Sequence, residues 1–269
     1  MNSKELAWRM RRHELEMVHN THASHIGAAL SVTDIIAVLY SDILKYNSER
    51  PKDDSRDRVV LSKGHAGIAM YSALAESGFF SVEELDKYYT NGSVYSGHVS
   101  HKGIPGVEFS TGSLGHGVSV ACGLALAAKI QKKSHRVYAI MGDGECDEGV
   151  VWETALVGNQ KKLNNFIVIV DHNHMQAMGD CEEVCSLEPL GDKWRSFGWD
   201  VIELEDGNDH DQLRDALTKE MGESPRCIIA NTIKGKGISF MENQLLWHYR
   251  DPQGEFYEKA VEELEAQRP

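Results

Sequence analysis

Five short apolar runs that alternate with helical stretches constrain the fold of this 269-residue chain more than any other feature. The apolar runs lie at residues 58–61, 136–141, 166–170, 200–204 and 226–230. The stretches between them that favour helix include residues 114–133, 149–162 and 210–221. Strands that are apolar on both faces and alternate with helices are typical of a parallel sheet covered on both sides. We therefore predict an α/β fold: a doubly wound, mostly parallel sheet with helices on both faces.

Two further helices are predicted before the first strand. Residues 3–20 are rich in helix formers and repeat apolar side chains at helical spacing. A second, amphipathic helix is predicted from Thr33 to about Tyr46, with Ser31 or Thr33 as its N-cap. Residues 84–110 are poor in apolar side chains, which predicts a long ordered loop, and such loops are often functional. Because the chain has no repeat, linker or low-complexity tract, we expect residues 1–269 to form one domain.

The charge balance argues against two broad classes of partner. Lys and Arg number 28 against 41 Asp and Glu, which gives a formal net charge of −13. Binding to nucleic acid or to an anionic membrane surface needs a basic excess, so neither is expected, and any phosphate must be held by a local site. The N-terminus lacks the apolar segment of a signal peptide, and we expect no stretch of roughly 18 apolar residues that would span a membrane. The five cysteines include no CxxC pair, so we interpret them as reduced thiols of a cytoplasmic protein.

Ligands of such sheets bind at the carboxyl ends of the strands, and four predicted ends carry polar, glycine-containing or acidic segments. These segments are Ser62–His65, Gly142–Gly149, Asp171–Met175 and Thr232–Gly237. In the second, glycine N–H groups can face a diphosphate while Asp143 holds a hard cation between its oxygens. Asn173 lies 30 residues after Asp143, the span of one helix and one strand, so its amide oxygen is predicted to complete the coordination. Lys63 and Lys234 can add positive charge to the same crevice.

Two histidines beside Asn173 suggest an alternative, because His172 and His174 are residue types that bind transition metals. Alternating residues of a strand face opposite sides of the sheet. We therefore expect one or both of these histidines to have a structural or surface role.

In order along the chain, the motifs resemble those of transketolases. Gly142-Asp143-Gly144 followed by Asn173 is similar to the GDG…N signature of enzymes that use thiamine diphosphate. Around this signature stand Ser24–Gly27, Ser62–His65, Gly97–His98, Pro105–Glu108, Ser110–Gly115 and Trp247–His248. The GDG…N element alone marks the cofactor class. The histidines together with the SKGH and STGSLG segments are more specific, and they resemble the N-terminal half of transketolase over nearly the whole chain.

The resemblance implies a thiamine diphosphate cofactor bound through Mg²⁺, or through Ca²⁺ or Mn²⁺. It implies that Asp143, the Asn173 side chain and the Met175 carbonyl bind the metal, which as a hard ion prefers oxygen ligands. The other implied cofactor positions are Lys63, His65, Gly112, Leu114, Gly144, Glu148 and Lys234. Of these, Glu148 matches an acid at the subunit interface that links the paired cofactor sites. Its position is equally compatible with a first-turn carboxylate favoured by the helix dipole.

The resemblance also implies an activity. Transketolases transfer a two-carbon ketol unit from a ketose to an aldose, and protons move to and from the substrates at several steps. Histidines suit such proton transfer because their ordinary pKa is near neutrality. His25, His98 and His248 match the histidines of the family's substrate channel, and we expect them to be the catalytic residues.

A full transketolase continues with a pyrimidine-binding domain and a C-terminal domain, which are absent from these 269 residues. The resemblance therefore implies the N-terminal subunit of a split transketolase. Its C-terminal partner subunit would supply the Glu that protonates the aminopyrimidine ring, so this chain is expected to be inactive alone. An even-numbered assembly of two such subunits with two partners, α₂β₂, is expected.

Three departures from the family pattern lie near the predicted substrate entrance. His116 stands where many transketolases have Gln, Ser24-His25-Ile26 replaces Gly-His-Pro, and the segment Trp247–Arg250 replaces Trp-His-Gly-Lys-Pro. These changes leave open whether the donor is a pentose or related ketose phosphate, an apulose phosphate or a sulfo-sugar.

Two other functions stay open at this point. The α subunit of a 2-oxoacid dehydrogenase or related decarboxylase would share GDG…N but not the several channel histidines. A non-catalytic nucleotide- or metal-binding regulatory module would share only the fold.

Overall fold

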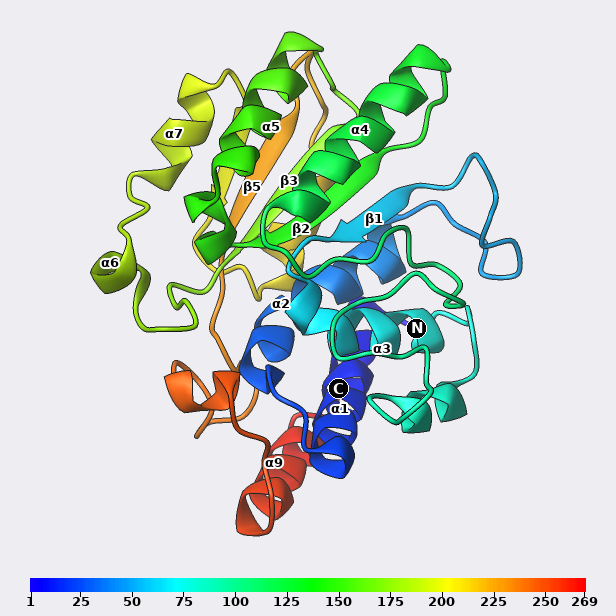
Figure 1. Ribbon diagram of the computed structural model, residues 1–269, viewed down its shortest axis with the longest axis vertical. Coiled ribbons are helices and arrows are strands. Elements are labelled where there is room, and N and C mark those ends of the chain that lie inside the picture. Colours follow the sequence, from blue (N-terminus) through cyan, green and yellow to red (C-terminus); the bar gives the residue numbers. More distant parts are fainter.

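A five-stranded parallel sheet organises the computed structural model, which describes residues 1–269 (Figure 1). The strands are β1 (Arg58–Leu61), β2 (Val137–Gly142), β3 (Phe166–His172), β4 (Asp200–Leu204) and β5 (Arg226–Asn231). They lie in the order β1-β2-β3-β5-β4, and all neighbours are parallel. The predicted α/β class is confirmed, and each predicted strand lies within two residues of its observed bounds.

Helices cover both faces of the sheet, as the apolar strands predict. The helices of the chain are α1 (Ser3–Thr21), α2 (Ile26–Val38), α3 (Gly67–Glu76), α4 (His116–Ile130), α5 (Gly149–Gln160), α6 (Cys181–Val184), α7 (Leu190–Ser196), α8 (His210–Thr218) and α9 (Glu255–Ala266). Successive strand residues enter two separate cores: Ile167 and Ile169 of β3 pack with α1, α2 and α3, whereas Val168 and Val170 pack with α4, α5 and α7. In Figure 1, α4 and α5 lie on one side of the sheet and the blue α1 and α2 on the other.

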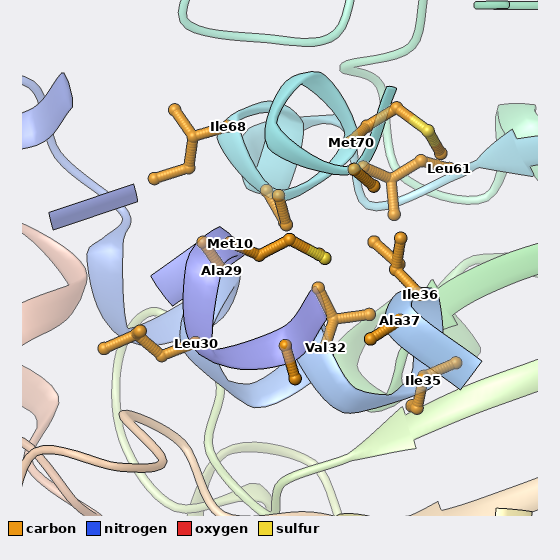
Figure 2. Close-up of a cluster of buried hydrophobic side chains, with 14 of the residues drawn as sticks. Met10, Ala29, Leu30, Val32, Ile35, Ile36, Ala37, Leu61, Ile68 and Met70 are labelled. Atoms are coloured by element: carbon orange, nitrogen blue, oxygen red, sulfur yellow. The ribbon is translucent and has the colours of Figure 1, made fainter. Parts of the chain in front are cut away.

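Helix α2 begins at Ile26, so the prediction of a helix that starts near Thr33 is wrong. Its residues are buried all round, and a helix in the centre of a domain shows no amphipathic period from which its start can be read. The cluster around it is drawn in Figure 2, where side chains of α2 lie beside Met10 of α1 and Ile68 and Met70 of α3. The proposed caps lie inside the helix and donate to buried acceptors: Ser31 to Asp171 and Thr33 to Glu14.

By length and composition alone, the stretch Ile26–Ile43 is apolar enough to cross a membrane. This contradicts the expectation that no such stretch exists. However, 83% of it is buried inside the protein, as in the core helix of a globular domain.

The predicted long loop is present and is held against the end of β1. It begins with a short 3₁₀ helix, Val82–Lys87, and continues without regular structure to α4. The Val99 N–H donates to the Gly64 carbonyl at 2.9 Å, and the Thr111 N–H donates to the Val99 carbonyl at 3.2 Å. The Thr111 hydroxyl donates to the Leu61 carbonyl at 2.5 Å. These bonds bring His98 and Gly112 of the loop to the carboxyl edge of the sheet.

A buried carboxylate between α1 and α2 gives a prediction about stability. Glu14 is fully buried, and burial raises its pKa from 4.5 to about 7. Between these pH values the folded protein holds a proton that the unfolded chain has lost, so stability falls as pH rises through this window. We expect Glu14→Gln to remove this fall and to gain about 2 kcal/mol relative to wild type between pH 5 and 8. Urea unfolding at several pH values measures this. Glu16→Gln, exposed on the same helix, is the control, and an unchanged pH profile in Glu14→Gln would contradict the prediction.

Candidate active site

A pocket of about 360 Å³ opens at the carboxyl ends of the strands. It brings together all the predicted site residues but one: His25, Lys63, His65, His98, Gly112, Leu114, Asp143, Gly144, Asn173, Met175, Lys234 and His248. Glu148 is the exception. Glu148 immediately precedes α5, is exposed and does not line the pocket. This chain therefore does not place Glu148 at the cavity, where the resemblance led us to expect a cofactor contact.

The sheet register places the GDG turn and Asn173 side by side. Gly142 of β2 pairs with Asp171 of β3, so the residues that follow leave the sheet at the same edge. One Asp143 oxygen accepts a hydrogen bond from the Gly144 N–H at 2.8 Å, and the other accepts from the His174 N–H at 2.8 Å. The Asn173 amide oxygen accepts from the Met175 N–H at 3.2 Å. Turn and strand end are therefore tied together through these polar groups.

These groups fit a hard divalent cation. Asp143 is buried, and burial raises its pKa, so a cation beside it would offset the cost of holding the carboxylate away from water. Carboxylate, amide and carbonyl oxygens are the donors that Mg²⁺ and Ca²⁺ prefer. No group of three or more His, Cys, Asp or Glu side chains is arranged to hold a metal. The protein oxygens therefore need further oxygens from a ligand such as a diphosphate.

Two buried lysines supply positive charge to the pocket. Lys63 pairs with Asp171, and the Lys234 ammonium donates to the Met175 carbonyl at 3.0 Å. Burial, together with the charge of Lys63, lowers the pKa of Lys234 to about 8. Gly64, next to Lys63, lets the Thr111 backbone approach closely, because a Cβ there would lie 2.4 Å from the Thr111 carbonyl oxygen. The pair of cations suits a multiply charged anion.

Four imidazoles share the pocket wall. The ring of His25 lies 4.9 Å from that of His248, 5.3 Å from that of His65 and 5.7 Å from that of His98, measured between centroids. Burial, with the neighbouring cations, lowers the pKa of His25 to about 4 and the pKa of His248 to about 3, and it lowers the pKa of His65 as well. These three rings are therefore neutral at physiological pH and are able to accept a proton.

The backbone of His25 is held in an unusual conformation. Its φ is +74°, in the left-handed region that residues other than glycine rarely adopt, and it immediately precedes α2 as the N-cap residue. Its N–H donates to the His248 carbonyl at 2.9 Å, which joins the start of α2 to the Trp247-His248 turn. Such strain persists only where the surroundings fix it, and it is concentrated at functional sites.

The comparison with known proteins covers the part of the chain that contains these pocket residues. Residues 2–250 match the family described as "Transketolase, thiamine diphosphate binding domain". The chain belongs to the transketolase family.

Relatives within the transketolase family include separate subunits as well as full-length enzymes. A subunit of the apulose-4-phosphate transketolase of Phocaeicola vulgatus is 43% identical over 94% of this chain and 90% of its own length. The 6-deoxy-6-sulfo-D-fructose transketolase subunit SqwG of Clostridium sp. is 40% identical over 95% and 94%. Human transketolase is 33% identical over 98% of this chain but only 42% of its own length.

A solved transketolase structure has the same fold. Transketolase from Campylobacter jejuni superposes with a TM-score of 0.92 at 32% identity, over 98% of this chain and 43% of that one. The chain thus spans less than half the length of the full-length transketolases that it matches.

Two buried carboxylates, Glu145 in the pocket wall and Asp171 outside the lining, are not among the predicted site residues. Glu145 accepts from the Ser62 hydroxyl at 2.6 Å, the Gly115 N–H at 2.7 Å and the Gly142 N–H at 2.9 Å. Asp171 accepts from three side chains, those of Ser31, Lys63 and Thr232. An acidic residue at or beside the end of an apolar strand is the signal that could have found them, since burial there requires partners.

His172 and His174 do not face opposite sides of the sheet, because residues two apart along a strand share a face. Their ring centroids lie 4.0 Å apart. Neither lines the pocket, and His174 is exposed. His116 is exposed at the start of α4, where its Nδ1 lies 3.1 Å from the Leu114 carbonyl oxygen.

The low pKa of His248 gives a second prediction. The cation of Lys234 contributes to it, so Lys234→Met is expected to raise the titration midpoint of His248 above about 3, as measured by NMR of the imidazole. Lys236→Met, on the same loop but outside the pocket, is the control and should leave the midpoint unchanged. A midpoint that Lys234→Met did not raise would show that the ring is held neutral without Lys234, by burial and its other charged neighbours.

Proposed function

We propose that this chain is the thiamine diphosphate-binding subunit of a two-subunit transketolase. The observation that carries the proposal is the single pocket in which Asp143, Asn173, two lysines and four histidines meet. The 2-oxoacid dehydrogenase and regulatory-module alternatives account for the GDG turn or the fold, but neither accounts for the four imidazoles.

In the proposed site the chain holds the cofactor at its diphosphate end. The carboxylate of Asp143, the amide oxygen of Asn173 and the carbonyl of Met175 bind Mg²⁺, and Mn²⁺ or Ca²⁺ can replace it. Lys63 and Lys234 balance the negative charge of the diphosphate. The remaining contacts of the proposal come from the Gly144 N–H, His65, and the backbone of Gly112 and Leu114. When bound, thiamine diphosphate supplies a nucleophilic carbon that takes up the two-carbon unit.

The histidines act on the sugar. A neutral imidazole at His25 or His248 takes a proton from a substrate hydroxyl and returns it to the product, and His98 completes this side of the pocket. Burial keeps the rings of His25 and His248 neutral, so either imidazole can accept a substrate proton without first losing one of its own.

The proposed substrates are a ketose donor and an aldose phosphate acceptor. Relatives at 43% and 40% identity are named for apulose 4-phosphate and for 6-deoxy-6-sulfo-D-fructose, whereas human transketolase is 33% identical. This supports an apulose phosphate or a sulfo-sugar in place of the usual pentose phosphates. A cytoplasmic location is proposed with this function, in keeping with the free cysteines.

The pyrimidine-binding domain is proposed to come from a partner subunit. The support is that relatives named as transketolase subunits match over about their whole length, while full-length transketolases match over less than half of theirs. In this proposal residues 1–269 form the single diphosphate-binding domain, and two copies with two partners make an α₂β₂ assembly.

Two copies of the chain are proposed to associate through α4 and α5. A shallow groove of about 280 Å³ lies between these helices, and a Cβ added at Gly123 there would point into open space, with no atom of another element within 4 Å. Leu156 and Val157 on α5 are 58% and 44% exposed, and Glu148 immediately precedes that helix. Apolar side chains gathered in this way suit a two-fold interface.

A charge placed in this interface is expected to separate the copies. Val157→Glu should weaken self-association by about tenfold or more, because it buries an unpaired carboxylate. Light scattering after size exclusion over a concentration series measures this, with Val94→Glu on the long loop as control. Unchanged association in Val157→Glu would exclude this face.

The function is tested with the partner subunit present. We expect the two chains together to transfer a two-carbon unit between sugars, and we expect this chain alone to be inactive. Oxidative decarboxylation of a 2-oxoacid would favour the dehydrogenase alternative. Calorimetry with thiamine diphosphate and Mg²⁺, compared with ATP, tests the regulatory module: binding of ATP alone would overturn the proposal.

A further inference from the structure

The hydroxyl of Ser31 lies directly beneath the predicted metal site, although it belongs to α2 in the core. Ser31 is fully buried, and so is Asp171, while Asn173 is 4% exposed. The Ser31 oxygen is 2.6 Å from a carboxylate oxygen of Asp171 and 3.3 Å from the Asn173 amide nitrogen. One hydroxyl therefore joins a buried carboxylate to the amide of Asn173.

The single proton of the Ser31 hydroxyl decides the direction of its hydrogen bonds to Asp171 and to Asn173. The Asp171 carboxylate accepts from three side-chain donors, the Lys63 ammonium and the hydroxyls of Thr232 and Ser31. Ser31 has a single proton and two acceptors within reach, the Ala28 carbonyl at 3.1 Å and the Asp171 carboxylate at 2.6 Å. The shorter distance assigns the proton to Asp171, because two oxygens at 2.6 Å without a proton between them would repel. Toward Asn173 the Ser31 oxygen is thus an acceptor, so it must face the amide NH₂ group.

This direction fixes which way the Asn173 amide points. With its NH₂ group held by Ser31, its oxygen is turned to the other side, where it accepts from the Met175 N–H at 3.2 Å. A flipped amide would put its oxygen against the Ser31 oxygen and its NH₂ group against an N–H donor. Both contacts would be lost, and an NH₂ group would face the place of the cation.

Two further side chains donate hydrogen bonds to Asp171. The carboxylate that anchors Ser31 is therefore itself fixed in position. Lys63 at the end of β1 and the hydroxyl of Thr232 at the end of β5 both donate to it. Removal of the Ser31 hydroxyl would leave Asp171 with these two partners. Asn173 would instead lose the only side-chain partner of its NH₂ group.

We propose that Ser31, anchored by Asp171, is a positioning residue that orients the Asn173 amide and so sets the affinity of the site for its divalent cation. The inference rests on the proposed function, because it takes Asn173 as a metal ligand. Partners that orient a ligand in this way typically contribute about 10–100-fold to metal affinity. Ser31 itself touches neither metal nor substrate in this proposal.

The experiment is a Mn²⁺ titration of the full chain with saturating thiamine diphosphate, followed by electron paramagnetic resonance. We expect Ser31→Ala to weaken Mn²⁺ binding by about 10–100-fold. Thr33→Ala is the matched control: it also removes a buried hydroxyl of α2, one that donates to Glu14 and to the Ala29 carbonyl. It should lower the melting temperature without changing Mn²⁺ affinity.

A second measurement needs no metal. The Asn173 side-chain NH₂ signals, identified by their loss in Asn173→Asp, should exchange slowly with solvent in wild type and quickly in Ser31→Ala. If the alanine variant does not fold, Ser31→Cys keeps the volume but bonds weakly, and the same two losses are expected.

The outcomes separate this inference from the function beneath it. Mn²⁺ affinity that falls in Asn173→Ala but not in Ser31→Ala would overturn the role of Ser31 and leave the function intact. Equal losses in Ser31→Ala and Thr33→Ala would show a general effect of destabilising α2 and would also overturn it. Absence of metal-dependent thiamine diphosphate binding by the wild-type chain with its partner subunit present would overturn both.

Discussion

Replacement of Asp143 by alanine is expected to abolish metal-dependent binding of thiamine diphosphate and, with it, all activity of the assembled enzyme. Asp143 is the one carboxylate among the three predicted metal ligands, and it is buried at the edge of the sheet. Without it, a divalent cation would have only neutral oxygens from the protein. We expect the affinity for thiamine diphosphate with Mg²⁺ to fall by about 100-fold or more. Loss of a residue that only orients a metal ligand costs up to about 100-fold, and loss of a ligand itself should cost at least as much.

The control for this loss lies on the same turn. Asp147 is exposed and does not line the pocket; its carboxylate accepts from the amide of Gln176, a residue of the pocket wall, at 2.7 Å. Asp147→Ala should bind the cofactor as wild type does. Calorimetry of both variants with Mg²⁺ present, and again with a chelator, measures the effect. Wild-type affinity in Asp143→Ala would exclude this turn as the metal site and, with it, the proposed function.

The strands and the edge that carries the site are predictable because their signals are local. Parallel strands buried on both faces are continuous apolar runs, so the predicted bounds of β1 and β4 agree with the structure to the residue. The spacing from Asp143 to Asn173 corresponds to one helix and one strand, which is why the structure brings the two residues to neighbouring strand ends. Here the chain order alone implies proximity.

The parts that are not predictable depend on contacts between distant segments. The start of α2 escapes prediction because a helix surrounded by core has no polar face, and its hydroxyls, which resemble caps, serve buried carboxylates. The partners of Asp171 come from α2 and from the ends of β1 and β5, up to 140 residues away in sequence. No pattern along the chain encodes such a meeting point.

The second large effect is expected at His25, at the centre of the four imidazoles. Its ring is neutral at pH 7 because burial lowers its pKa to about 4, so it is available as a base. We expect His25→Asn to lower kcat of the assembled enzyme by about 10²–10⁴-fold, the usual contribution of general acid–base catalysis. Asn suits the test because it tolerates the left-handed backbone at this position and does not transfer protons near neutral pH.

Cofactor binding separates this role from a structural one. His25→Asn should bind thiamine diphosphate with Mg²⁺ about as wild type does, since the proposed metal ligands are elsewhere. His101→Asn, exposed on the long loop and bonded to Ser110, should keep wild-type kcat. The activity of the wild-type enzyme that depends on His25 should decline only as pH falls toward about 4, where this ring becomes charged. A kcat within a few-fold of wild type in His25→Asn would remove His25 from the chemistry and assign its strained backbone to the packing of α2 alone.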